Sequence, residues 1–214
     1  MHCRLLSLLA LNLLVLSLLP AALFAADSQN AGFTTDLFNG QNLQGWHVTG
    51  CEVEVVDGAL KLVAGDGFVR TDHRYGDFVL ELQWRPLRAE KYDSGIYFRC
   101  ELPPEGKPWP TQYQLNLLQG KEGTVGGLEG SKPRPDLIKA GQWNTFRLKV
   151  VGKDVALEIN GQRAWQGTGI DAPAGYIGFQ AEVPGGGPFE FRDIRITQLG
   201  HRPLFTGQTL AHWE

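Results

Sequence analysis

The chain has 214 residues, a formal net charge of -3 at pH 7 and 43 % hydrophobic residues. The 20 Lys and Arg are balanced by 23 Asp and Glu, and no basic stripe of the kind that follows a phosphate backbone is visible, so we expect no nucleic-acid partner. The 27 Gly and 12 Pro indicate many turns between short elements, which favours an all-β domain.

The first 26 residues predict a secretory signal peptide. Met1–Arg4 is a short positive start, Leu5–Leu19 is nearly all apolar, and Ala21–Ala26 offers small residues for cleavage near Ala25 or Ala26. An uncleaved membrane anchor is the alternative, but the apolar run is shorter than the roughly 20 residues that a spanning helix needs. We therefore expect an exported protein, periplasmic or extracellular, with no membrane contact after cleavage. A polar linker is expected at 27–35.

Strand patterns follow one another through the predicted domain at 36–198. Asp57-Gly58 and Asn160-Gly161 are hairpin dipeptides between alternating apolar segments. Such closely spaced short strands are typical of a β-sandwich. Besides 77–85, the expected strands are 52–56, 59–63, 68–71, 94–100, 111–118, 143–151, 155–159, 162–165, 176–181 and 189–196.

The strand at 77–85 shows the clearest alternation, since its apolar residues fall on one face. These residues are Phe78, Leu80, Leu82 and Trp84. We assign three tryptophans to the core, namely Trp46, Trp84 and Trp143. The polar stretch 119–141 is predicted to be a long irregular loop, which in a compact domain is usually functional or mobile.

One internal repeat is present. The segment 37–46, LFNGQNLQGW, matches 204–213, LFTGQTLAHW, in register. We interpret residues 201–214 as the start of a second, truncated copy of the domain. The alternative is a C-terminal tail that packs on the sandwich.

Two successive strands carry polar side chains on otherwise apolar patterns. Tyr97 and Arg99 are two residues apart in 94–100, and Gln112, Gln114 and Asn116 have the same spacing in 111–118. Residues two apart point to the same face of a strand. We therefore expect these groups to form a concave polar surface, which suits a ligand rich in hydroxyl groups.

Short motifs in a fixed order cover about residues 36–198. They include Leu37-Phe38-Asn39-Gly40, Gly45-Trp46, Val56-Asp57-Gly58, Tyr75-Gly76-Asp77-Phe78, Ser94-Gly95-Ile96, Tyr113-Gln114-Leu115, Gln142-Trp143-Asn144, Gly175-Tyr176-Ile177-Gly178 and Phe191-Arg192-Asp193-Ile194. Together these motifs resemble the 3-keto-disaccharide hydrolase domain family. The resemblance implies a concanavalin-like jelly-roll β-sandwich of two antiparallel sheets, export, and glycosidic bond cleavage in 3-keto-glycosides or disaccharides.

Chemistry of the family type needs a base near C2 of the oxidised sugar, a donor for the developing enolate oxygen and an acid for the leaving group. Arg99 is the predicted donor, because a guanidinium stays charged and offers several N–H groups; a structural salt bridge is its alternative role. Glu101, Glu182 and Asp93 are the candidate acids and bases. Each is also a possible surface carboxylate.

Amide and aromatic groups are the predicted substrate contacts. Gln114 and Gln180 are expected to fix sugar hydroxyls, with Gln112 and Asn116 beside them, and Tyr97 and Trp109 to stack on a pyranose ring. The sequence departs from the family at Gln112 and Leu117, where acidic residues are common. A non-catalytic carbohydrate-binding module is therefore the alternative to an enzyme, and a structural or adhesive sandwich is a third possibility.

The remaining groups suggest no cofactor. The five histidines show no ligand spacing, and two cysteines without a nearby histidine pair do not make a zinc site, so we predict no metal. After signal cleavage Cys51 and Cys100 remain, and either a disulfide or two buried free thiols is possible. We predict a sugar or oxidised sugar as the ligand, and we make no prediction about oligomeric state.

Overall fold

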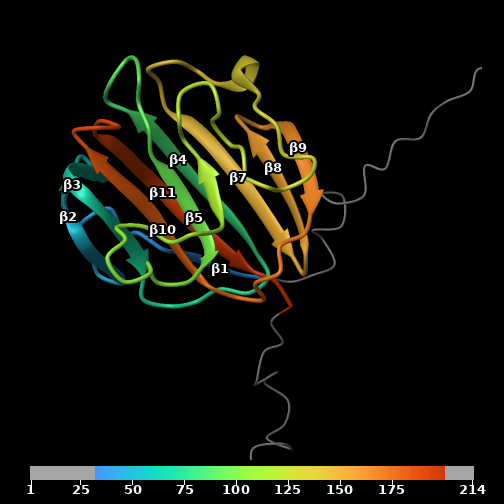
Figure 1. The fold of residues 1–214 in the computed structure, drawn as a ribbon. Helices are drawn as coiled ribbons and strands as arrows, with labels where there is room; N and C mark the ends of the chain where they lie inside the picture. Colours follow the sequence, from blue (N-terminus) through green and yellow to red (C-terminus); the bar gives the residue numbers. More distant parts are fainter. Residues whose placement is uncertain (1–31, 201–214) are drawn as a thin grey trace, which may run out of the picture.

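A computed structural model describes residues 32–200, so the predicted signal peptide and the second copy at 201–214 lie outside the described residues (Figure 1). The fold is an all-β sandwich. Its strands are β1 (Phe33–Asp36), β2 (Trp46–Val56), β3 (Ala59–Thr71), β4 (Phe78–Pro86), β5 (Gly95–Cys100), β6 (Gln114–Asn116), β7 (Asn144–Val151), β8 (Asp154–Ile159), β9 (Gln162–Thr168), β10 (Tyr176–Val183) and β11 (Phe189–Gln198), with one 3-10 turn, η1 (Pro135–Leu137).

The strands form one curled antiparallel sheet whose two parts face each other. Its order is β6-β5-β10-β3-β11-β4-β7-β8-β9, with β2 paired to β3 and β1 paired to β11. We call β6, β5, β10 and the second half of β3 the front layer, and β11, β4, β7, β8 and β9 the back layer (Figure 1). The long strand β3 joins the layers, since Leu60–Leu62 pairs with β11 and Gly65–Arg70 pairs with β10. This architecture confirms the predicted jelly-roll β-sandwich.

Aromatic stacking across the two layers holds the core together. Phe179 of β10 stacks on Phe191 of β11 with ring centroids 4.0 Å apart, and Trp46 covers the other side of Phe179 at 5.3 Å. The predicted inward face of β4 is confirmed, because Phe78, Leu80, Leu82 and Trp84 are all buried. Burial of these large side chains drives the two layers together.

Several predicted boundaries were wrong. The expected strands at 59–63 and 68–71 are parts of the single strand β3, and β6 is only Gln114–Asn116 instead of 111–118. Residues 33–35 of the predicted linker at 27–35 belong to β1, which pairs with the end of β11. These differences share one cause, since strand limits are set by partners far away in the sequence.

Trp143 is not a core residue. It lies half-buried next to β7, with the guanidinium of Arg85 at 4.5 Å and that of Arg192 at 4.0 Å from its ring. A cation over an indole ring is favourable at such distances. Arg192 also donates to Gln83 on β4, so the side chains of the last strand and its neighbour are hydrogen-bonded.

The two cysteines of the domain are free thiols. Cys51 belongs to β2 and Cys100 ends β5, and strands β3 and β10 lie between them. Burial raises the pKa of Cys51 to about 11 and that of Cys100 to about 12. Of the two alternatives, the structure has the unpaired thiols. No helix within residues 32–200 is long and apolar enough to cross a membrane.

Candidate functional site

The outward side of the front layer carries the polar residues that the sequence singled out, and we call it the front face. Alternation places Gln180 and Glu182 on it, because Phe179, Ala181 and Val183 point into the core. The register then adds neighbours on the adjacent strands, since Gln180 lies opposite Gly95 and Phe68, and Tyr97 lies opposite Gln114.

A chain of side-chain amides crosses three strands of this face. The Gln114 amide on β6 donates to the Gln180 carbonyl oxygen on β10, and Gln180 Nε2 donates to Glu182 Oε2 at 2.8 Å. Gln180 is only 5 % exposed. Because buried amides must be satisfied, this chain fixes the orientation of the Glu182 carboxylate.

Gly95 makes the crossing possible. A Cβ at this position would overlap the side-chain amide of Gln114, which therefore lies directly over strand β5 on its way to Gln180. The neighbouring Ser94 is buried, and its hydroxyl donates to the backbone oxygen of Gln180 at 2.7 Å. The Ser-Gly pair is thus a structural requirement of the amide chain.

Two carboxylates at this end of the face have raised pKa values. Burial is the main cause for Glu182, and the nearby charges of Asp93 and Asp66 add to it, while the hydrogen bond from Gln180 partly offsets the rise in pKa. Burial also raises the pKa of Asp93, opposed by the hydrogen bond from Ser94 and the charge of Lys121. A raised pKa brings a carboxyl group closer to the range in which it can exchange protons near neutral pH.

An aromatic cluster lies next to the amide chain. Phe68 and Tyr97 meet edge to face at 5.5 Å, and Trp109 packs against them from the loop between β5 and β6. The Trp109 indole N–H donates to the backbone oxygen of Ala181 at 3.0 Å, which fixes the ring over the front face. Burial, with the charges of Cys100 and Asp93, raises the pKa of Tyr97 to about 12, so its hydroxyl keeps its proton.

Arg99 does not lie on the front face, because an extra residue in β5 interrupts the alternation of side chains before Arg99. Tyr176 lies opposite Cys100 and Gly178 opposite Tyr97, so β5 has one extra residue, and Arg99 has φ 45°. This bulge places Tyr97 and Cys100 on the front face in place of Tyr97 and Arg99. The expectation that Tyr97 and Arg99 point the same way was wrong.

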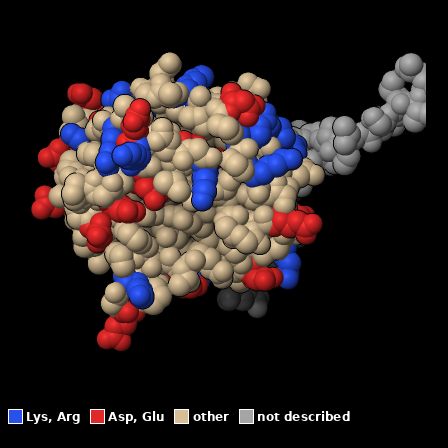
Figure 2. Space-filling model, turned by 45° about the horizontal axis from the view of Figure 1, so that its top comes forward, with Lys and Arg blue, Asp and Glu red and all other residues tan. Residues whose placement is uncertain are grey.

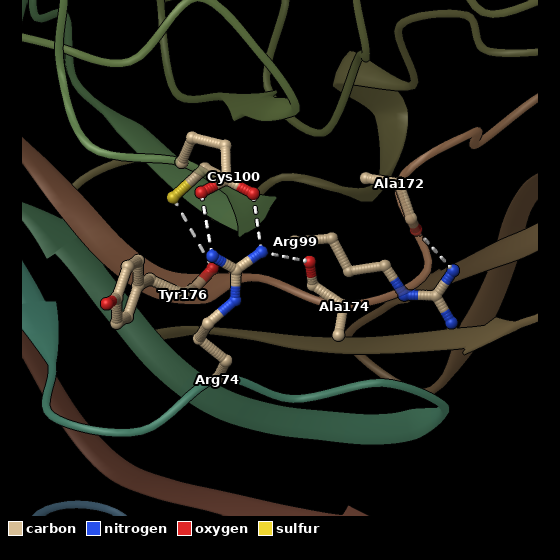
Figure 3. Close-up of polar contacts among 7 residues, drawn as sticks. Arg74, Arg99, Cys100, Ala172, Ala174 and Tyr176 are labelled. Carbon is tan, nitrogen blue, oxygen red and sulfur yellow. Dashed lines mark hydrogen bonds and ion pairs between the residues drawn. The ribbon is translucent and has the colours of Figure 1, made fainter.

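The Arg99 guanidinium is fully buried at the end of the sandwich. It donates to the backbone oxygens of Gly76, Gly152 and Ala172 at 2.9, 2.5 and 3.0 Å and to Asp77 Oδ1 at 2.6 Å. Figure 3 shows its contact with Ala172. With these partners the side chain closes the end of the fold, and it is not directed at the front face. This geometry matches the alternative role of Arg99, which is a structural salt bridge.

Glu101 is also engaged elsewhere. Its exposed carboxylate makes a bidentate ion pair with Arg74. Arg74 also donates to the backbone oxygen of Ala174 at 2.9 Å, a contact drawn in Figure 3. The hydrogen bonds from Arg74 lower the pKa of Glu101. A carboxylate held as the anion by a neighbouring guanidinium is a weak base. Among the three predicted acids and bases, Glu182 and Asp93 are therefore brought together and Glu101 is apart.

The two remaining predicted contacts lie at the edge of the site. Asn116 shares the face with Gln114, and its Oδ1 accepts from the backbone N–H of Leu118 at 2.6 Å. Gln112 is exposed and lies before the first residue of β6. The alternation along β6 therefore does not determine on which face its side chain lies. Residues 32–200 contain no group of three or more His, Cys, Asp or Glu that would hold a metal. On the face displayed in Figure 2, acidic and basic side chains are interspersed, and the basic ones lie mainly in its upper half.

The family assignment rests on the sequence. A family model described as the 3-keto-alpha-glucoside-1,2-lyase-like domain matches residues 33–197. The chain belongs to this family. The suspected resemblance is therefore confirmed over the whole sandwich. No curated protein is similar enough to count as a match.

Solved structures with the same fold include proteins linked to carbohydrates. A candidate glycosyl hydrolase from Parabacteroides distasonis ATCC 8503 has a TM-score of 0.62 at 20 % identity, covering 78 % of this chain and 100 % of its own. Carbohydrate-binding module CBM66 from Bacillus subtilis has a TM-score of 0.54 at 12 % identity, covering 71 % and 94 %. The beta-glucanase of Bacillus licheniformis has a TM-score of 0.54 at 15 % identity, covering 79 % of this chain and 99 % of its own. At these identities the likenesses show the fold alone.

Proposed function

We propose that the front face binds an oxidised sugar and that the protein cleaves the glycosidic bond of 3-keto-glycosides by elimination and hydration. The observation that carries this proposal is the chain from Gln114 through Gln180 to Glu182, which ends in a partly buried carboxyl group of raised pKa beside Asp93. Membership of the lyase-like family and the carbohydrate-related names of the structural neighbours support it.

The chemistry assigns a role to each group. A ketone at C3 acidifies the C2 hydrogen, and Glu182 as the carboxylate takes that proton. The electron pair then forms the C1–C2 double bond while the C1–oxygen bond breaks, and Asp93 in its protonated form supplies the proton that the leaving oxygen needs. Addition of water across the double bond completes the net hydrolysis.

The developing enolate oxygen needs a donor, and Arg99 is not available for that role. Tyr97 is the phenol on the same face, and with a pKa of about 12 its hydroxyl remains a donor at neutral pH. Trp109 forms the aromatic wall of the site and Gln180 orients the base. Because proton removal by Glu182 begins the reaction, we expect substitution of Glu182 to lower the turnover rate more than substitution of any other residue of the site.

A non-catalytic carbohydrate-binding module is the second candidate. Gln112 and Leu117 stand where family members commonly have acidic residues, and Leu117 is fully buried. The amides of Gln114 and Gln180 would then serve only to shape the face for sugar hydroxyls. In either case we propose that the protein is exported, on the basis of the N-terminal signal pattern.

The test uses an aryl 3-keto-glucoside and the corresponding unoxidised aryl glucoside. Release of the aryl alcohol from the keto substrate, and none from the unoxidised one, is the expected result. Binding of the keto substrate without release would select the binding module. Neither binding nor release would overturn both candidates.

A further inference from the structure

A separate pocket of about 390 Å³ opens on the back layer, away from the amide chain. Its floor is formed by outward residues of three adjacent strands, and its rim by the turn after β1 and the hairpin between β2 and β3. The residues that the argument uses are Asp36, Glu81, Gln83, Thr145, Asp193 and Arg195. Its size is within the range of about 300–1,000 Å³ that is common for small-ligand sites.

The pocket arises because β11 changes partner along one side. Phe189–Phe191 pairs with β3, whereas Arg195–Gln198 pairs with β1. The residues between them have no strand partner on that side, and only the backbone N–H of Leu37 bridges the gap, donating to Ile194 O at 2.8 Å. The sheet is therefore open at this point.

A bulge turns a carboxylate toward the opening. Between Arg192 and Arg195, β11 has one residue more than β4, and Asp193 has φ 51°. A left-handed conformation at a non-glycine residue is uncommon, and bulges often re-aim side chains next to binding sites. The Asp193 side chain is 60 % exposed and lines the pocket.

Several groups around the pocket can accept or donate further hydrogen bonds, although two of its carboxylates lie near a cation. Arg192 Nε is 3.7 Å from Asp193 Oδ2, and Arg147 Nε is 3.8 Å from Glu81 Oε1. Within residues 32–200 the Arg195 guanidinium has no hydrogen bond or ion pair, although Asp36 and Glu81 lie opposite it on the two neighbouring strands. Gln83 accepts one bond from Arg192 through Oε1, which leaves its Nε2 to donate. Thr145 adds a hydroxyl. The lining thus holds both donors and acceptors around a mostly polar space.

This combination selects among ligand classes. Three carboxylates and one guanidinium line the pocket, and the guanidiniums of Arg192 and Arg147 lie beside two of these carboxylates. The local charges are therefore nearly balanced, which favours a neutral ligand over a strongly anionic or cationic one. The carboxylates do not come together as a metal site, since no group of three His, Cys, Asp or Glu within 32–200 could hold an ion. A neutral polyol offers hydroxyl donors to the carboxylates and hydroxyl acceptors to the guanidinium and amide.

We propose that this pocket is a second binding site, distinct from the front face, for a neutral saccharide. Asp193 and Arg195 are its main contacts, with Gln83 and Thr145 beside them. The site stands independently of the proposed chemistry at Glu182, because the two lie on opposite outer sides of the sandwich.

The test is a titration of the 15N-labelled protein with maltose, followed by amide chemical shifts. We expect saturable shifts at Thr145, Asp193 and Arg195, with a Kd of about 1 mM or weaker. Asp193→Asn keeps a residue type that tolerates φ > 0, and Arg195→Gln replaces the guanidinium with a neutral amide. Each should weaken the binding at least about fivefold, equivalent to roughly 1 kcal/mol at the conversion of 1.4 kcal/mol per tenfold.

Two controls separate this site from the front face. Gln180→Ala should leave the shifts at Thr145 and Asp193 unchanged, and ethylenediamine, as a cationic probe, should not displace maltose. The proposal is overturned if maltose shifts only front-face amides, if it shifts none, or if Asp193→Asn and Arg195→Gln bind it as well as the unmodified protein. Preferential binding of ethylenediamine would identify an amine site and would also overturn it.

Discussion

Arg99 and Gln180 belong to neighbouring strands of the front layer, but their polar groups end in different surroundings. Arg99 reaches three backbone oxygens and Asp77, and its side chain has no contact with solvent. Gln180 passes its hydrogen bond on to Glu182, whose carboxyl group is only partly buried. A polar group that is fully satisfied by fixed partners supports the fold, whereas a relay that ends at a partly exposed acid with a raised pKa supports chemistry.

The largest effect is expected at Arg99. Arg99→Met removes the cation from Asp77 and leaves three buried backbone oxygens without a donor, so the free energy of unfolding should fall by about 3–5 kcal/mol. Urea unfolding measures this loss. Arg74→Gln, at an exposed guanidinium on the same side of the domain, is the matched control and should leave the midpoint nearly unchanged. Equal stability of Arg99→Met and the unmodified protein would contradict the structural role.

Gly95→Ala should have the next largest effect. The added methyl group displaces Gln114 from its path over β5, and overpacking of this kind costs about 1–3 kcal/mol. The displacement should also broaden or shift the side-chain amide resonances of Gln114 and Gln180. Gly126→Ala is the control, because a Cβ there has no heavy atom within 4 Å. If both variants keep native stability and native amide resonances, the crossing over Gly95 is not as described.

Trp109→Ala should weaken sugar binding by about tenfold, since contacts to an aromatic ring contribute about 0.5–1.5 kcal/mol beyond the area they bury. Trp109→Phe should recover most of the affinity. Isothermal titration with the keto-glucoside measures both. Unchanged affinity in the alanine variant would remove Trp109 from the site while leaving the carboxylates in place.

Glu182→Gln should have the smallest effect on stability, and the sign depends on pH. The folded-state pKa of Glu182 is raised above its unfolded value, so the folded state keeps a proton that the unfolded state has released. The stabilisation that this group contributes is therefore lost as the pH rises from the unfolded-state pKa of Glu182 through its higher folded-state pKa. The variant should melt at a higher temperature than the unmodified protein near about pH 7, and at the same temperature near about pH 3. A lower melting temperature at neutral pH would contradict the raised pKa.

Local signals were sufficient for much of the fold. The Asp57-Gly58 and Asn160-Gly161 turns and the alternation of 77–85 depend on neighbours in sequence, and they lie where the patterns indicate. The closely spaced strand patterns predicted a β-sandwich, and the family resemblance implied its jelly-roll type. Strand ends were less accurate because pairing across the sheet sets them, as in β3, where one strand serves both layers.

The candidate site was only partly predictable. Spacing correctly placed Gln114 with Asn116, because that short stretch alternates without interruption. It did not place Glu182 with Gln180, since the expected strand ended at 181 whereas β10 continues to Val183. Spacing gave the wrong face for Arg99, because the extra residue of β5 is visible only in the pairing of β5 with β10 and not in the local sequence. The partnership of Glu182 with Asp93 was also invisible, because about ninety residues separate them in the sequence and only the fold brings them together.

The most direct test of the account compares two glutamates that the sequence offered as equals. Aryl alcohol release from the 3-keto-glucoside is measured with Glu182→Gln and with Glu101→Gln under the same conditions. The account predicts that Glu182→Gln lowers kcat by about 100-fold or more, as expected for loss of a general base, and that Glu101→Gln turns over normally. Loss of turnover in Glu101→Gln with normal turnover in Glu182→Gln would contradict it.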